Sequence, residues 1–438
     1  MNFDEKYLAD WSGLTRGTPQ AVERPRSTEE VAAVVRRCTG SGARMTVQGG
    51  LTGMAGGAVP ADGDVVINLE RMSAIEQIEE LEGIMIVQAG ATLEQVQRAA
   101  REAGWFFPVD LGARGSCQVG GNASTNAGGD RVLRYGTMRD SVLGVEAVLP
   151  DGTVLDSMTR LVKNSSGLDL RFLFIGAEGT LGIVTRLVLK LQPPPGPAVT
   201  AFAAVANLDA VARLLRDLKG SLGPVLQAYE FMSAAFVEAA VRHGGARRPL
   251  ESDASWYVLL EAAGATGQSV EDAVQAALEQ AVERELVTDC AIAASLSDAA
   301  DFWRLRQCIP ELLSHYKPTV NFDVGLPWSE TTSYIERVSK RMQAEFPDAE
   351  HLFFGHLGDN NIHLMTGPHP LERHHAVDDV VYGELAGRDG TLSAEHGIGF
   401  LKKPFLATTR NPSQLALLRK LKQVLDPGNL LNPGRVID

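Results

Sequence analysis

Two glycine-rich stretches decide the fold: Gly120-Gly121-Asn122-Ala123-Ser124-Thr125-Asn126-Ala127-Gly128-Gly129 and the earlier Gln48-Gly49-Gly50-Leu51-Thr52-Gly53-Met54-Ala55-Gly56-Gly57. Glycine lets backbone amides approach a pyrophosphate closely and adopt positive φ angles. Polar side chains within both stretches can add donors: Thr52, Ser124, Thr125 and Asn126. A tight turn between packed elements explains one such stretch equally well. Two long stretches in one region favour a site for a dinucleotide.

The spacing of these glycines excludes two common nucleotide-binding motifs. No G-x-G-x-x-G follows the first expected strand with an acid about twenty residues further on, so the Rossmann fingerprint is absent. The lysine of the P-loop is also absent. A dinucleotide held mainly by backbone amides of the two glycine stretches remains.

Helices and strands alternate around the glycine stretches. A helix is expected from Ser27 to Gly42, with Glu30 completing a capping box, and Thr92 with Gln95 begins another. Strands are expected at residues 44–47, 64–69, 84–88, 146–149, 172–175 and 183–191. Three consecutive prolines at 193–195 cannot extend a ladder and indicate a domain boundary.

The second part of the chain alternates in a similar way. Strands are expected at residues 201–205, 227–231, 256–261, 320–325, 352–357 and 362–365, and helices at 209–219, 270–284, 296–315, 330–346 and 412–425. This order indicates one sheet with helices packed on a face. We expect an α+β fold whose second domain is an antiparallel sheet covered by helices. We therefore expect a cofactor-binding domain at 1–195, a substrate domain at 196–405, and a C-terminal helix and tail at 406–438 that return to the first domain.

Composition limits the partners and the location. A chain of 438 residues suits two domains, and its net charge of −13 argues against nucleic acid as a partner. Four scattered cysteines fit a reducing compartment and do not suggest a cysteine-built zinc site. The N-terminal stretch carries early acids, and no apolar run approaches about 18 residues. We therefore expect a cytoplasmic protein without a transmembrane segment, and peripheral membrane contact stays open.

Seven of the nine histidines fall between His351 and His396. A turn at 358–361 would set His356 opposite His363 on one face of a hairpin, with Cβ atoms about 5 Å apart. Two imidazoles so placed can share a metal ion, although a pair of half-exposed strand histidines is the plain alternative. Three further histidines lie among prolines and charged residues and are expected at the surface: His369, His374 and His375.

A carboxylate and an imidazole stand side by side in Ser393-Ala394-Glu395-His396-Gly397-Ile398-Gly399. Two histidines and a carboxylate form a metal site that leaves room for a substrate. An adjacent histidine that is not a ligand can act as a general base near neutral pH.

The first part of the chain is similar to the FAD-binding domain of the vanillyl-alcohol-oxidase superfamily, known as the PCMH type. The matching pieces follow the family order: residues 25–31, the two glycine stretches, 87–90, 135–136 and 178–185. The resemblance implies FAD bound between two α+β subdomains. The cofactor-binding residues that it implies are Gly49, Gly50, Leu51, Thr52, Gly53, Met54, Gly57, Pro108, Gly112, Gly120, Gly121, Asn122, Ser124, Thr125, Asn126, Gly128, Gly129, Tyr135, Gly136, Glu178, Gly179, Gly182, Ile183, Val184 and Asn432.

Some members of this superfamily tether the flavin covalently through a histidine. The first histidine of this chain is His243, which lies outside the expected FAD domain. Cys117 is the other conceivable tether, but a small buried residue is its plainer role. We therefore expect FAD to be bound non-covalently.

The second part resembles the branch of D-lactate, glycolate and D-2-hydroxyglutarate dehydrogenases. The matching runs are residues 355–359, 361–363, 393–399, 426–429 and 432–434. The resemblance covers essentially the full chain, and it implies three ligands for a divalent metal, zinc before manganese or iron: His356, His363 and Glu395. It also implies His396 as the base and Arg306 as the arginine that binds the substrate carboxylate. The alternative for Arg306 is a charge on a helix surface.

The resemblance implies oxidation of a D-2-hydroxy acid, D-lactate-like or D-2-hydroxyglutarate-like, to the 2-keto acid by hydride transfer to flavin N5. It implies an electron acceptor such as a quinone, an electron-transfer flavoprotein or a cytochrome, and a homodimer is the default assembly. The D-2-hydroxyglutarate members carry a threonine, a lysine and an asparagine at positions that read Pro310, Asn321 and Met365 here. This departure favours a short or partly apolar monocarboxylate.

Two other functional classes stay open on the sequence. A flavin-binding electron-transfer subunit would need neither the metal ligands nor the base. A zinc hydrolase with a nucleotide-binding appendage would leave the two glycine stretches without an FAD role.

Overall fold

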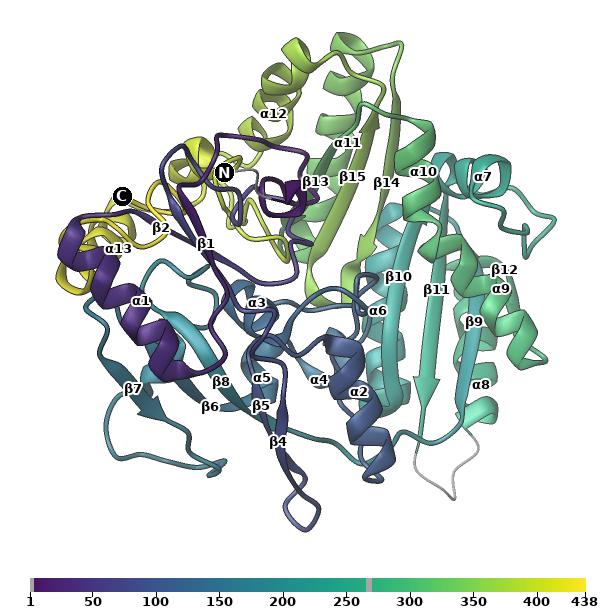
Figure 1. The fold of residues 1–438 in the computed structure, drawn as a ribbon. Coiled ribbons are helices and arrows are strands. Elements are labelled where there is room, and N and C mark those ends of the chain that lie inside the picture. Colours follow the sequence, from purple (N-terminus) through teal and green to yellow (C-terminus); the bar gives the residue numbers. More distant parts are fainter. Residues whose placement is uncertain (1–3, 265–269) are drawn as a thin grey trace. The chain divides into compact units, whose positions relative to one another are not determined.

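The computed structural model describes residues 4–264 and 270–438, and the chain forms two compact units (Figure 1). The first unit contains Met1–Gly129, Tyr135–Pro194 and Glu395–Asp438, and the second contains Asp130–Arg134 and Pro195–Ala394. After the short segment Asp130–Arg134, the chain passes into the second unit again at the expected proline stretch. It returns to the first unit at Glu395, where the sequence suggested residue 406.

The first unit contains two sheets. Parallel strands β1 (Ala21–Glu23), β3 (Val65–Asn68) and β2 (Met45–Gln48) form one, and antiparallel strands β4 (Ile75–Glu79), β5 (Ile84–Gln88), β8 (Ile183–Lys190), β6 (Val142–Val148) and β7 (Val154–Ser157) form the other. The helices are α1 (Thr28–Ser41), α2 (Leu93–Glu102), α3 (Val119–Thr125), α5 (Met138–Ser141) and α13 (Pro412–Leu425), and α4 (Val132–Tyr135) spans a unit boundary. One hydrophobic core includes residues of both sheets.

The helix starts expected from the sequence are present. Ser27 accepts a hydrogen bond from the amide of Glu30 and caps α1, and Thr92 and Gln95 form a reciprocal capping box at α2. The carboxylate of Glu30 accepts from the amide of Arg26 instead of closing a box with Ser27. One expected strand is wrong, because residues 172–175 overlap the 3-10 helix η2 (Leu170–Leu173).

A buried lysine holds the C-terminal segment in the first unit. Nζ of Lys422 donates to the carbonyl oxygens of Thr180 and Leu431, at 2.9 and 2.6 Å, and to Asp426 Oδ2 at 2.7 Å. Desolvation lowers the pKa of Lys422, and the neighbouring Asp426 opposes this shift. A buried carboxylate that loses its cation is costly, so this pair has a large structural role.

Replacing Lys422 by alanine is expected to lower the free energy of unfolding by about 3–5 kcal/mol, because it leaves Asp426 buried without its cation. Urea unfolding followed by circular dichroism measures the effect. Lys420→Ala is the matched control, because Lys420 lies on the same helix and is exposed. Equal unfolding midpoints for the two variants would contradict the assignment.

The second unit is a seven-stranded antiparallel sheet with helices on both faces. Its strands, in spatial order, are β12 (Val287–Ile292), β9 (Ala198–Val205), β11 (Trp256–Ala263), β10 (Leu226–Ser233), β14 (Glu350–His356), β15 (Asn361–Gly367) and β13 (Val320–Gly325). The helices are α6 (Leu208–Leu222), α7 (Ala234–His243), α8 (Val270–Glu283), α9 (Leu296–Gln307), α10 (Ile309–His315), α11 (Trp328–Glu345) and α12 (His374–Gly383). The single helix expected at 296–315 divides at Cys308, just before Pro310.

The two faces of this sheet differ in what covers them. Met232 packs with Phe302, on α9, and Leu312, on α10, in one hydrophobic cluster. Tyr229 lies three residues away on the same strand and donates to the carbonyl oxygen of Val211 on α6. Because successive strand residues alternate between faces, α9 and α10 cover one face and α6 covers the other.

The register of the β14–β15 hairpin differs from the expected one. His363 lies opposite Phe354 rather than His356, and His356 pairs with Glu230 of the next strand. The 3-10 turn η4 (Leu357–Asp359) and Asn360, with a φ of 72°, close the hairpin earlier than the sequence suggested. A shift of two residues preserves the face of every side chain, so both histidines still point to the same side.

Candidate active site

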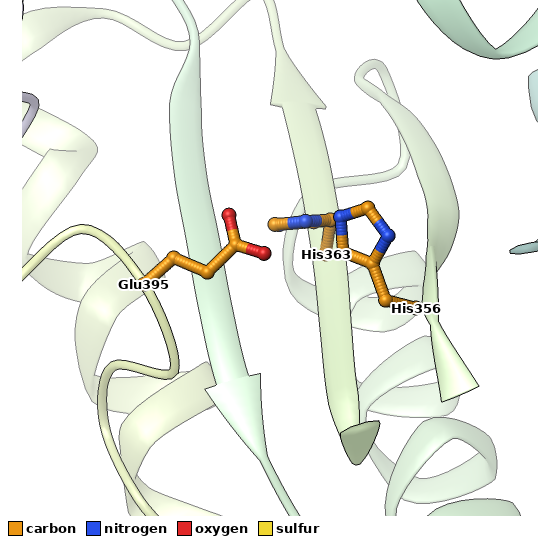
Figure 2. Close-up of side chains that lie close together, drawn as sticks. All are labelled: His356, His363 and Glu395. Carbon is orange, nitrogen blue, oxygen red and sulfur yellow. The ribbon is translucent and has the colours of Figure 1, made fainter. Parts of the chain in front are cut away.

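Two histidines and a glutamate converge at one end of the second unit's sheet (Figure 2). His356 ends β14, His363 lies in β15, and both are buried. Each of these two residues and Glu395 offers a ligand atom, and the three atoms lie within 4.8 Å of one another. The two rings are nearly perpendicular, with centroids 5.3 Å apart. The structure therefore brings together the three metal ligands implied by the resemblance.

The edge of β13 directs the chain toward this cluster. The amide of Ala394 donates to the carbonyl oxygen of Asp323 at 2.7 Å, and the hydroxyl of Ser393 donates to Asp323 Oδ2 at 2.7 Å. Asp323 is fully buried and lies opposite His363 in the sheet. Glu395 follows directly after Ala394, so this anchoring fixes where its side chain starts.

A buried glutamate connects His356 with Arg306. Glu230 Oε1 lies 2.7 Å from Nδ1 of His356, and Oε2 accepts from Nε of Arg306 at 2.7 Å. Desolvation alone would raise the pKa of Glu230, but its interactions with His356 and Arg306 outweigh desolvation and hold that pKa below its usual range. Glu230 therefore orients both side chains.

This arrangement selects one tautomer of His356. Since the carboxylate of Glu230 accepts at Nδ1, that nitrogen carries the proton and Nε2 carries the lone pair. Nη2 of Arg306 lies 3.0 Å from Nε2 and donates to this lone pair, so a bound metal ion would take the place of that hydrogen bond. An imidazole held this way by a carboxylate is the usual form of a metal-binding histidine. Two imidazoles and one carboxylate fit zinc with an open position for a substrate.

Arg306 belongs to this site and is not a surface charge. It is 7% exposed, and its guanidinium lies 4.9 Å from the centroid of the Phe354 ring. Arg304, on the same helix, donates instead to the carbonyl oxygen of Gly244 and to Glu311. The helix therefore presents only one of these two arginines to the histidine pair.

Three acidic residues of this region were missed in the sequence. Glu230 and Asp323 are charged residues inside otherwise apolar strands, a pattern that signals a buried polar role. Asp130 follows the second glycine stretch, and its carboxylate forms a second close group with Glu230 and His356, again within 4.8 Å. The histidine pair therefore lies among more carboxylates than the sequence motifs suggest.

His396 follows Glu395 and is half-buried.

The three histidines that were expected at the surface differ in their burial. His375 is exposed and His374 is half-buried, but His369 is 2% exposed and lies 2.8 Å from the hydroxyl of Thr366. The surface assignment is therefore wrong for His369, because its amide also donates to the carbonyl oxygen of Pro318 at 2.8 Å and the chain stays packed there.

The glycine stretches lie within the first unit. The first follows β2, and the second contains the short helix α3. A Cβ atom on Gly50 would lie 2.0 Å from the carbonyl oxygen of Ser116, so only glycine allows the two segments to touch there. A cavity of about 410 Å³ borders the first stretch and the residues just before the second, and it is lined in part by Gly49, Leu51 and Gln118.

The hydroxyl donors expected in the second stretch are already engaged. The hydroxyls of Ser124 and Thr125 donate to the carbonyl oxygens of Gly120 and Gly121, four residues earlier. Oδ1 of Asn126 accepts from Thr137 and from the amide of Arg139. Backbone amides and Nδ2 of Asn126 therefore remain the fitting donors for a pyrophosphate. Gly121 has no atom within 4 Å of its Cβ position, which leaves room for a bound group beside the backbone.

Other residues that were expected to bind the cofactor also lie in the first unit. Pro108 is buried in the segment between α2 and α3, and Gly112 has open space at its Cβ position. Tyr135 ends α4, and Gly136 has a φ of 75°. The remaining ones surround the start of β8: Glu178, Gly179, Gly182, Ile183 and Val184.

Asn432 reaches back to these segments from the C-terminal tail. Its Oδ1 accepts from the amide of Val47 at 2.8 Å, and its Nδ2 donates to the carbonyl oxygen of Glu178 at 2.9 Å. Its side chain therefore connects the strand before the first glycine stretch with the segment before β8.

The folds and the buried cluster define a flavin-dependent oxidoreductase. The chain matches the FAD binding domain family over residues 19–157 and the C-terminal domain of FAD linked oxidases over residues 195–436. It belongs to the FAD linked oxidase family.

Relatives align along nearly the whole chain. D-2-hydroxyglutarate dehydrogenase of Xanthomonas citri pv. viticola is 40% identical over 441 residues, covering 99% of this chain and 92% of the relative. The mitochondrial D-2-hydroxyglutarate dehydrogenase of Bos taurus is 37% identical over 431 residues, covering 98% of this chain and 78% of the relative. A mitochondrial protein of Schizosaccharomyces pombe, provisionally named a D-lactate dehydrogenase, is 35% identical over 444 residues, covering 99% and 84%.

The fold is that of the PCMH-type flavoproteins. A structure of p-cresol methylhydroxylase superposes with a TM-score of 0.81, at 16% identity, over 99% of this chain and 92% of the other. The expected fold class is therefore confirmed. In residues 4–264 and 270–438, no helix is both long enough and apolar enough to span a bilayer.

Proposed function

We propose that this chain is an FAD-dependent, metal-assisted dehydrogenase that oxidises a D-2-hydroxy acid to the 2-keto acid. One observation carries the proposal: His356, His363 and Glu395 offer ligand atoms within 4.8 Å of one another, and His396 follows the carboxylate ligand directly. The names of the D-2-hydroxyglutarate and D-lactate dehydrogenases that align with the chain support it.

In the proposed reaction, each step is assigned to a different group. FAD, when bound, supplies the hydride acceptor, and a metal ion supplies a Lewis acid for the substrate's 2-hydroxyl. His396 takes the hydroxyl proton as the hydride leaves C2. Arg306 binds the substrate carboxylate and so orients C2. Glu230 keeps His356 in the tautomer that a metal needs.

Within this class we place monocarboxylates first. Met365 lies two residues from His363 on the same face, is 2% exposed and belongs to an apolar cluster. Asn321 of β13, which pairs with Met365 in the sheet, donates to the hydroxyl of Thr319. An apolar thioether offers nothing to a second carboxylate, so D-lactate-like acids fit better than D-2-hydroxyglutarate.

FAD is proposed to be non-covalent, and the metal is proposed to be zinc. Cys117 is buried, and desolvation raises the pKa of its thiol, so it is a poor nucleophile toward the flavin. The proposed acceptor is a quinone, an electron-transfer flavoprotein or a cytochrome, and the proposed assembly is a homodimer.

Activity with an artificial electron dye tests the reaction. The panel contains the D and L forms of lactate, malate and 2-hydroxyglutarate, together with glycolate, and the 2-keto product is measured. We expect turnover of D-acids only, with lactate ahead of 2-hydroxyglutarate in kcat/KM. A yellow protein that oxidises none of them would favour an electron-transfer subunit.

Replacing Arg306 by lysine is expected to cost about 2–5 kcal/mol in kcat/KM, mainly through a higher KM, because lysine cannot reproduce the planar fork. Steady-state kinetics with the best acid measures it. Arg304→Lys is the matched control on the same helix, and its kinetics should stay close to those of the unmodified enzyme. Equal kinetics for the two variants would remove Arg306 from the substrate site.

A further inference from the structure

Glu178 holds the chain just beyond the proposed base. Its Oε1 accepts from the amide of Ile398 at 2.6 Å, and its Oε2 accepts from the amide of Gly399 at 2.8 Å. These residues follow His396 by two and three positions. Hydrogen bonds from amides to an ionised carboxylate are among the stronger ones in proteins.

The fit around this carboxylate leaves no space for side chains. A Cβ atom on Gly397 would lie 2.9 Å from Cδ of Glu178, and the φ of Gly397 is 79°. The positive φ therefore favours glycine at 397, and a larger residue there would also press on the carboxylate of Glu178. The two hydrogen bonds to Glu178 therefore constrain the conformation of the chain between His396 and Gly399.

The backbone of Glu178 is fixed to other parts of the FAD unit. Its amide donates to the carbonyl oxygen of Ser124, in the second glycine stretch, at 2.8 Å. Its carbonyl oxygen accepts from Nδ2 of Asn432 at 2.9 Å. Its φ of 51° lies in the left-handed region that non-glycine residues rarely adopt. Surrounding contacts must hold such a conformation, and it tends to occur at functional sites.

We propose that Glu178 is a positioning residue that sets Glu395 and His396 in register with the second glycine stretch. The sequence suggested a direct role for Glu178 in binding FAD. Its carboxylate instead accepts two amides of the segment that carries a metal ligand and the base. The proposal rests on the proposed function for its kinetic consequence, but not for its effect on the chain at 395–399.

The direct test replaces Glu178 by glutamine. The new NH₂ group would face one of the two amide donors, so one hydrogen bond is lost and the segment loosens. Glu146→Gln is the matched control, because Glu146 is a buried glutamate of the same unit that accepts from the hydroxyls of Thr28 and Thr185. Glu178→Asp, which keeps the charge but shortens the side chain, serves if the glutamine variant fails to fold.

Three measurements on the FAD-loaded proteins separate positioning from folding. Hydrogen–deuterium exchange of a peptide covering residues 396–401 should become faster in Glu178→Gln than in the control. Metal affinity, measured by competition with a chelator, should fall about 10–100-fold, as for other residues that support a metal ligand. The rate of flavin reduction by the best D-acid should fall up to about a hundredfold, because a misplacement near 1 Å costs that much.

A loss of FAD with unchanged exchange, metal affinity and flavin reduction in the loaded fraction would overturn the proposal and leave Glu178 as a cofactor residue. Failure of the proposed function looks different. In that case the unmodified protein is not reduced by any hydroxy acid, while the changes in exchange and metal affinity still report on Glu178.

Discussion

Replacing His396 by alanine is expected to slow flavin reduction by the substrate about 10²–10⁴-fold while FAD stays bound, because a positioned general base contributes a factor of that size. His396 is half-buried and lies between two anchored segments. Ala394 is bound to Asp323 on one side, and Ile398 is bound to Glu178 on the other. Because the chain is anchored on both sides, little conformational entropy is lost in placing the imidazole where it takes the proton.

Anaerobic stopped-flow absorbance of the flavin measures this rate directly. His375→Ala is the control, because His375 is exposed on α12 and should leave the rate unchanged. Binding of FAD is checked by the visible spectrum of the same samples. A His396→Ala protein that reduces its flavin at the unmodified rate would assign the base to another residue.

Replacing His363 by alanine is expected to weaken metal binding and to slow flavin reduction about a hundredfold or more, because a Lewis acid supplies several kcal/mol of transition-state stabilisation. His363 is one of three residues that offer ligand atoms in the cluster. Its loss leaves two, fewer than the three protein ligands usual at a catalytic zinc. Removing the metal with a chelator should reproduce the same loss in the unmodified protein.

The metal content of purified variants, together with flavin reduction before and after chelation, measures both effects. His243→Ala is the control, because His243 stacks on His315 on another part of the second unit. Chelation that leaves the rate of the unmodified protein unchanged would contradict a catalytic metal. A His363→Ala variant with the unmodified metal affinity would remove His363 from the ligand set.

Local signals in the sequence predicted many elements well. Strand β5, strand β13 and helix α13 begin and end at the expected residues. Each has a local pattern that does not depend on distant contacts: β5 is a nearly continuous apolar run, β13 alternates apolar and polar residues, and α13 has a clear helix start. The sequence missed β4 and β7, whose exposed polar residues hide their pairing with β5 and β6.

The hairpin register shows why the site was only partly predictable. Turn residues at 358–361 indicated a hairpin, but the 3-10 turn moved the pairing by two residues. The shared face of His356 and His363 survived, because strand side chains repeat every two residues. The partner of His356, Glu230, lies 126 positions away, and no local pattern joins the two.

No local pattern in the sequence predicted the positioning role proposed for Glu178. Its run of glycine and threonine matched a cofactor motif, which led to a direct role with FAD. The amides that its carboxylate accepts belong to Ile398 and Gly399, 220 and 221 positions later. Only the folded chain brings such segments together.

The most direct test of the central claim is the visible spectrum of the purified protein under anaerobic conditions. D-lactate and the other D-2-hydroxy acids are added before chelation, after chelation, and after zinc is restored. We expect a yellow protein that a D-acid bleaches, that chelation protects from bleaching, and that zinc makes responsive again, while the L-acids have no effect. A yellow protein that keeps its colour with every acid, or one that bleaches equally well without metal, would contradict it.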